Sequence, residues 1–126
     1  SEDEISFDTK NAKLLSDSWL FAKERIKSLD VIEESLSLNP DDEKLVKQYV
    51  NIAFSAFEWN EVINGIRKAE KIGIEDDGKH DLMIGIAFFE TKNLIKAESS
   101  FIQASKSKKY ADQGRAWLEY LNALKG

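Results

Sequence analysis

The sequence predicts an all-α fold in which helical hairpins follow one another along the chain. Two observations predict this fold. Proline occurs once among 126 residues, and apolar residues recur at the spacing of an amphipathic helix rather than in strand-like alternation. The chain also repeats itself, because residues of related size return after 34 and then 35 positions. Such a period is typical of paired helices stacked in series.

The composition limits the classes of protein to which the chain can belong. A length of 126 residues suits one domain, residues 1–126. A content of 42% apolar and 33% charged residues is typical of a globular chain, and a net charge of −5 disfavours general nucleic-acid binding. No apolar run approaches the roughly 20 residues that cross a membrane. The absence of cysteine excludes thiol catalysis, disulfides and thiolate metal sites.

Helical spacing appears first in the N-terminal half. Apolar residues follow it from Leu14 to Ala22 and again from Leu29 to Leu36. The segment "NPDDE" then predicts a helix boundary, with Asn39 as the N-cap, Pro40 in the first turn and acidic residues at the positive end. The next two helices are expected over residues 43–57 and 60–72.

The C-terminal half continues the pattern. Gly73 suits a helix C-cap, and the following "GIEDDGK" predicts a loop. Helices are expected over about residues 80–91 and 94–106, followed by an amphipathic terminal helix that contains Ala116, Trp117, Tyr120, Leu121 and Leu124. About seven helices, antiparallel to their neighbours, are predicted in total. Trp19, Trp59 and Trp117 are expected at packing positions.

Five registers define the repeat, with one extra residue in the loop near residue 75. They are Ser16/Val50/Gly85, Trp19/Ala53/Phe88, Ser28/Val62/Ala97, Ile32/Ile66/Phe101 and Ser35/Ala69/Ala104. Two helices per period predict units over about residues 9–42, 43–77 and 78–109, followed by a terminal helix over about residues 110–125. Such a helix covers the last unit, as solenoid caps do.

The third unit resembles the tetratricopeptide repeat family. That family's pattern has a small residue and then an aromatic on the first helix, and Ala, Phe and Ala on the second. Gly85, Phe88, Ala97, Phe101 and Ala104 match all five positions. The resemblance covers about residues 9–109 and is most specific in the third unit. It implies a right-handed α-solenoid of three helical hairpins plus a C-terminal capping helix.

A narrower resemblance concerns residues 45–121. This segment is similar to the carboxy-terminal end of tetratricopeptide proteins found beside bacterial TonB energy-transduction systems. The shared features are Trp59, the entry from His80 to Leu82, the Gly85/Phe88 helix and the segment from Ala116 to Leu121. This resemblance implies an accessory of a bacterial envelope system in the periplasm; without it, a cytoplasmic location is expected.

No group of residues with a catalytic pattern is apparent. His80 is the single histidine, and neighbouring aspartates suggest a His–carboxylate base, but we expect a loop residue near a helix start. The acidic run Glu75–Asp77 lacks the spacing of a calcium loop. The chain contains no phosphate-binding loop, dinucleotide motif or nucleophile elbow. The sequence therefore predicts a non-enzyme without cofactor or metal.

The resemblance implies that the first helix of each unit lines a concave groove, which commonly holds an extended peptide or a partner helix in this family. The predicted partner-binding residues occupy the inward positions: Lys44, Lys47, Asn51, Phe54, Lys79, Ile86 and Phe89, after Lys10, Lys13, Asp17 and Leu20 in the first unit. An apolar floor with a lysine rim suits a peptide that carries hydrophobic anchors and acidic flanks.

The two adjacent phenylalanines are expected to differ. Phe88 should be buried in its own hairpin. Ile86 and Phe89 exceed what one packing stripe requires, so they are either covered by the terminal helix or a neighbouring chain, or available to a partner. The alternative function is therefore a structural domain that forms a homo-oligomer through its apolar groove or its terminal helix.

Overall fold

The computed structural model describes residue 21 and residues 23–126, and these contain six helices and no strand. Residues 23–38 are helical, and the helices that follow are α2 (Glu43–Ser55), α3 (Trp59–Lys71), α4 (Lys79–Glu90), α5 (Leu94–Ser105) and α6 (Ala111–Lys125). The predicted all-α class and the predicted boundaries of α2–α6 are confirmed to within about two residues. The helix expected from Leu14, which includes Trp19, lies outside the described residues.

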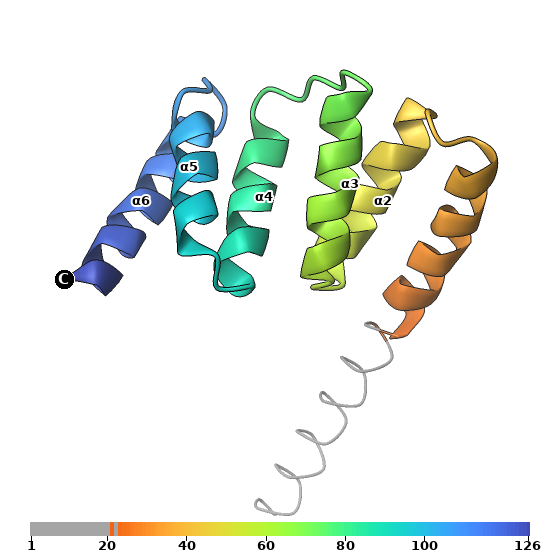
Figure 1. The fold of residues 1–126 in the computed structure, drawn as a ribbon, viewed down its shortest axis with the longest axis horizontal. Helices are drawn as coiled ribbons and strands as arrows, with labels where there is room; N and C mark the ends of the chain where they lie inside the picture. Colours follow the sequence, from red (N-terminus) through yellow and green to blue (C-terminus); the bar gives the residue numbers. More distant parts are fainter. Residues whose placement is uncertain (1–20, 22) are drawn as a thin grey trace, which may run out of the picture.

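The helices stand side by side in one row, and each runs antiparallel to the next (Figure 1). Helix α2 packs on α3, α3 on α4, α4 on α5, and α5 on α6. The helix over residues 23–38 joins the row through two hydrogen bonds. Tyr49 Oη donates to Glu33 Oε1 at 2.9 Å, and Arg25 Nη1 donates to the carbonyl oxygen of Ser55 at 3.0 Å. Consequently α2, α4 and α6 run in the same direction.

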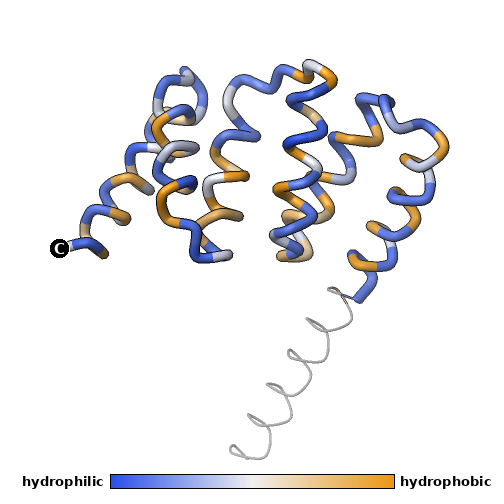
Figure 2. The backbone as a smooth tube through the Cα atoms, viewed as in Figure 1, coloured by the Kyte–Doolittle hydropathy of each residue, from blue (hydrophilic) through white to orange (hydrophobic). Residues whose placement is uncertain are grey.

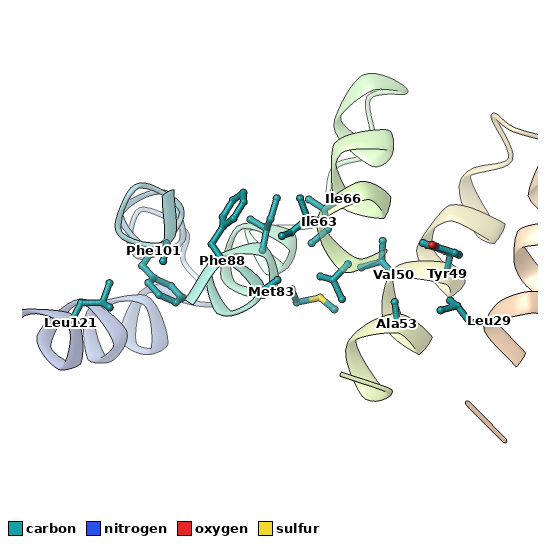
Figure 3. Packing of buried hydrophobic residues seen from close by; sticks show 14 residues of the cluster. Leu29, Tyr49, Val50, Ala53, Ile63, Ile66, Met83, Phe88, Phe101 and Leu121 are labelled. Carbon is teal, nitrogen blue, oxygen red and sulfur yellow. The ribbon is translucent and has the colours of Figure 1, made fainter. Parts of the chain in front are cut away.

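One apolar core extends along the whole row, from Leu121 of α6 to Leu29 of the first helix (Figure 3). The packing positions predicted for the second and third units are all buried: Val50, Ala53, Val62, Ile66, Ala69, Gly85, Phe88, Ala97, Phe101 and Ala104. In the first unit, by contrast, Ser28 is exposed. Its hydroxyl donates to the carbonyl oxygen of Glu24.

Two helix ends repeat the same turn 35 residues apart. After α2, Phe57 has φ +58° and the backbone N–H of Glu58 donates to the carbonyl oxygen of Ala53 at 3.0 Å. After α4, Lys92 has φ +65° and the N–H of Asn93 donates to Phe88 at 2.8 Å. Both are left-handed C-terminal caps. The repeat therefore extends from side-chain packing to the backbone.

The N-cap of α2 differs from the prediction. Asp42 rather than Asn39 is the N-cap, because its Oδ1 accepts from the N–H of Leu45 at 3.1 Å. The carbonyl oxygen of Asn39 instead accepts from the N–H of Asp42 at 3.2 Å. Pro40, with its fixed φ, lies within the turn that this bond closes, so the N-cap lies three residues after Asn39.

The end of α3 agrees with the prediction. Gly73 has φ +83°, and the N–H of Ile74 donates to the carbonyl oxygen of Ala69 at 2.9 Å. Figure 2 shows apolar and polar segments alternating along the helices, whereas the connection between α5 and α6 is hydrophilic. Among the described residues, no helix combines the length and apolar composition needed to cross a membrane.

Candidate functional site

The predicted partner-binding residues lie on two parallel helices. Lys44, Lys47, Asn51 and Phe54 belong to α2, and Lys79, Ile86 and Phe89 belong to α4. Lys79 Nζ donates to Asn51 Oδ1 at 3.3 Å, although α3 separates the two residues along the chain. The fold therefore brings a predicted residue of one helix into contact with a predicted residue of the other.

The lysines of this surface differ in their surroundings. Lys44 is exposed, in the first turn of α2. Lys47 is half-buried and forms an ion pair with Glu43 of the same helix, with Nζ 3.2 Å from Oε1. Exposed pairs of this kind contribute little stability. Lys44 and Lys79 lie at helix N-termini, where the helix dipole is already positive.

Phe54 belongs to an aromatic cluster at the turn between α2 and α3. Its ring meets Trp59 edge to face at a centroid distance of 5.5 Å, and Phe57 lies 5.7 Å from the same indole. Trp59 is half-buried against the core, as predicted for a packing residue. Phe57 is 69% exposed despite its bulk.

Phe89 belongs to a second aromatic cluster, at the boundary between α4 and α6. Its ring centroid lies 5.3 Å from Trp117 and 5.7 Å from Tyr120. The terminal helix therefore covers Phe89 on one side, and the ring remains half-exposed on the other. Phe88 is only 8% exposed, as predicted, and Ile86 packs half-buried against the core.

A hollow of about 300 Å³ opens beside this second cluster. Phe89, Ala116, Trp117 and Tyr120 line it, and we call it the α4–α6 notch. Trp117 was expected only to pack between helices. It does so, because its indole stacks on Phe101 with centroids 5.1 Å apart and planes 8° apart, but it also forms a wall of the notch.

Ala116 and Tyr120 are candidate site residues that the sequence did not single out. They follow one another at a helical step of four on α6, and both are exposed, whereas the neighbouring Leu121 is buried. The apolar spacing of the terminal helix, which includes both residues, was the available signal in the sequence. The terminal helix thus contributes to the candidate surface in addition to covering α5.

His80 lies in the first turn of α4 and is buried, rather than exposed in the preceding loop. Asp76 Oδ2 accepts from the backbone N–H of His80 at 2.6 Å and lies 3.0 Å from its Nδ1. Gly78, the N-cap, has no side chain that can cap, so Asp76 satisfies this helix terminus. Burial lowers the pKa of His80, opposed by the Asp76 carboxylate.

Asp81, the next residue, has a raised pKa, first because of burial and then because of the carboxylates of Asp76 and Glu70. This perturbed group lies near His80 in sequence, but neither residue lines the notch. A second hollow lies elsewhere, among Asp41, Lys68, Lys71 and Ile72. Lys68 Nζ donates there to Asp41 Oδ1 at 3.3 Å. Within the described part of the chain, no group of His and acidic residues is arranged to hold a metal ion.

The described contacts connect α2, α4 and α6 into one surface, which we call the α2–α4–α6 face. It consists of the seven predicted residues together with Ala116, Trp117 and Tyr120. In Figure 1, α2 lies behind α3 and α6 lies behind α5, so the outer helices of this face share one side of the row. Comparison of the chain with family models, curated proteins and solved structures finds no match.

Proposed function

We propose that this chain is a non-catalytic protein-interaction module that binds a peptide or helix on its α2–α4–α6 face. The observation that carries the proposal is the hydrogen bond between Lys79 and Asn51. This bond joins the predicted binding residues of α2 to those of α4, in one polar surface beside exposed apolar side chains. A surface of this mixed character is typical of protein interfaces rather than of small-molecule pockets.

We also propose that the fold is a right-handed solenoid of three tetratricopeptide-like hairpins with a terminal helix. Two features support this proposal. The ten packing positions of the second and third units are buried, and the left-handed turn after α2 recurs 35 residues later. The similarity of residues 45–121 to proteins beside TonB systems is the basis for proposing an accessory role in a bacterial envelope system.

A photo-crosslinking experiment tests the location of the binding surface. A benzophenone amino acid replaces Asn51 on α2, and the matched control replaces Asn64 on α3. Both asparagines are exposed helical residues, but only Asn51 belongs to the α2–α4–α6 face. The protein with the probe at Asn51 should crosslink to a specific partner, whose peptide is then titrated against the unlabelled chain.

The titration includes the variants Lys79→Glu and, as a control of equal charge change, Lys108→Glu in the loop after α5. Lys79→Glu should weaken binding by about tenfold, because it places a carboxylate against the acidic flank expected in the partner. Equal crosslinking from positions 51 and 64, or equal affinity of the two charge variants, would remove the assignment of this face.

Self-association is the second candidate function, and one observation favours it. Tyr120 is 49% exposed and Leu124 is 54% exposed on the terminal helix, where a solenoid cap normally has a polar outer face. Sedimentation equilibrium over a hundredfold range of concentration separates the two functions. A concentration-dependent mass that Leu124→Lys abolishes would support assembly, whereas a constant monomer mass would exclude it.

A further inference from the structure

The α4–α6 notch has the dimensions of a subsite for one side chain. Its volume of about 300 Å³ lies at the lower limit for pockets that hold whole small molecules. Its lining combines three aromatic rings with the methyl group of Ala116. Polar hydrogen-bonding groups in this lining are limited to the indole N–H of Trp117 and the hydroxyl of Tyr120. The lining therefore suits a large apolar side chain.

The three rings contact one another directly. The centroid distances are 5.3 Å for Phe89 to Trp117, 5.7 Å for Phe89 to Tyr120 and 5.9 Å for Trp117 to Tyr120. Rings this close fill the space between them, so a cation cannot sit at the centre of the cluster as it does in an aromatic cage. An occupant must therefore lie against the outer surfaces of the rings, next to Ala116.

The walls of the notch are held in place from behind. Trp117 stacks face to face on Phe101, which is completely buried between α4, α5 and α6. A wall ordered before binding loses little side-chain entropy when an occupant arrives. This pre-organisation distinguishes the notch from Leu124, which is exposed at the C-terminal end of α6 and does not line the notch.

The opposite end of the face carries two lysines, although Glu43 and Asp81 occupy the same first turns. Lys44 and Lys79 occupy the first turns of α2 and α4, where a cation is normally disfavoured by about 0.3–1 kcal/mol. Their charge adds to the positive potential of the two helix N-termini instead of opposing it. Phe54 and Phe89, in contrast, are the second-to-last residues of the same helices. The face therefore has a lysine-bearing end and an aromatic end.

We infer that the α4–α6 notch receives one large apolar side chain of a partner segment whose acidic residues lie against Lys44 and Lys79. This inference rests on the proposed function and adds the orientation of the ligand. Lys79 and Phe89 are ten residues apart on α4, which is about 15 Å along the helix axis. An extended partner covers that length in about five residues, at roughly 3.3 Å each. The partner segment thus carries its acidic residues about five positions from its apolar anchor.

Charge complementarity favours a different protein as the occupant over a second copy of this chain. The chain carries a formal net charge of −5, so long-range repulsion is larger between two whole copies than between the chain and a short segment with two or three acidic residues. A lysine pair beside an apolar notch instead attracts a segment that is acidic and apolar. Complementary charge of this kind mainly raises the rate of association, whereas the apolar anchor lowers the rate of dissociation.

The test uses a phage-displayed library of random 16-residue peptides, selected on the full chain. The enriched peptides should share one large apolar residue and at least two acidic residues about five positions away. A synthetic fluorescent copy of the most enriched peptide is then titrated by anisotropy. Substituting its anchor by Ala should weaken binding by about tenfold or more, as expected for a residue that fills a pocket.

Two alanine substitutions on α6 form a matched pair. Ala116→Phe fills the notch, whereas Ala123→Phe adds the same ring to an exposed alanine that does not line it. We expect Ala116→Phe to weaken binding about tenfold and Ala123→Phe less than twofold. Tyr120→Ser, which removes one wall, should act like Ala116→Phe. Circular dichroism and thermal melting confirm that each variant is folded.

Double-mutant cycles assign each end of the peptide. The peptide whose anchor is replaced by Ala should bind the Ala116→Phe protein almost as well as it binds the wild type. Likewise, a peptide with Asn in place of its acidic residues should lose little further affinity when the protein carries Lys44→Glu. If the peptide is sensitive to Lys44→Glu and Lys79→Glu but indifferent to Ala116→Phe, the notch inference is wrong and the proposed function stands. If no peptide is enriched, both fail. A homodimer that Ala116→Phe dissociates would assign the notch to a second copy and overturn the inference.

Discussion

Gly85 of α4 lies directly against the ring of Phe101 of α5, because a β-carbon on Gly85 would lie 2.5 Å from Cε1 of Phe101. The ring of Phe101 is completely buried, and the indole of Trp117 stacks on it. One ring is thus fixed between a glycine of the third unit and a wall of the α4–α6 notch. Packing within the repeat and the shape of the candidate site are therefore linked.

Gly85→Ala should destabilise the fold. The added methyl group overpacks the core, at a cost of about 1–3 kcal/mol, and the higher helix propensity of alanine returns about 1 kcal/mol. We expect a net loss of up to about 2 kcal/mol in urea unfolding. Combining Gly85→Ala with Phe101→Leu should cost less than the sum of the two single changes, because the smaller side chain leaves room for the methyl group. Strict additivity would contradict the contact.

Phe57→Gly should stabilise the fold by about 0.5–1 kcal/mol, because glycine adopts a positive φ without steric cost. Phe57 has φ +58° and exposes most of its ring. The change is compared with Lys92→Gly, in the equivalent turn at φ +65°, by thermal unfolding of both variants. A gain for Lys92→Gly together with a loss for Phe57→Gly would show that the Phe57–Trp59 contact outweighs the backbone strain.

His80 predicts a stability that falls in mild acid. Burial lowers its pKa below the ordinary value of 6.5, so between the lowered pKa and 6.5 the unfolded chain binds more protons than the folded chain. The free energy of unfolding therefore rises with pH across this window. The stability that neutral His80 contributes is lost as the pH falls below about 6.5. The groups facing the ring are Asp76, Asp81, Lys79 and Lys47.

The measurement is urea unfolding of the wild type and His80→Gln between pH 5.5 and 7.5. Because His80 is the single histidine, the difference between the two curves isolates its titration. The wild type should lose stability on acidification faster than the variant, whose glutamine does not titrate. Parallel curves would mean that the folded and unfolded chains bind the imidazole proton equally.

Tyr49→Phe should loosen the helix over residues 23–38. The Tyr49 hydroxyl donates to Glu33 Oε1 at 2.9 Å, and burial together with that carboxylate raises its pKa, so it remains a donor at neutral pH. The loss of this hydrogen bond should lower the free energy of unfolding by about 1 kcal/mol. Amide hydrogen exchange should accelerate in residues 23–38 and remain unchanged in α5 and α6. Tyr110→Phe is the control, and an equal effect of both changes would contradict the assigned contact.

Much of this fold was predictable from local patterns. The buried positions of α2–α5 follow from spacing along each helix and from the 35-residue register, as the pairs Val50/Gly85 and Ile66/Phe101 show. The N-cap of α2 was wrong by three residues because three residues in "NPDD" have side chains able to cap. Only the turn around Pro40 decides between Asn39 and Asp42.

The sequence by itself determined the helices, their order and the residues that face the core, because helical periodicity and turn chemistry are local properties. It also placed lysines at the N-terminal ends of two helices. The tertiary structure decided what lies beside Phe89. Trp117 and Tyr120 reach its ring from another helix, about thirty residues away in the chain. The notch exists only through that contact, and no spacing within a single helix encodes it.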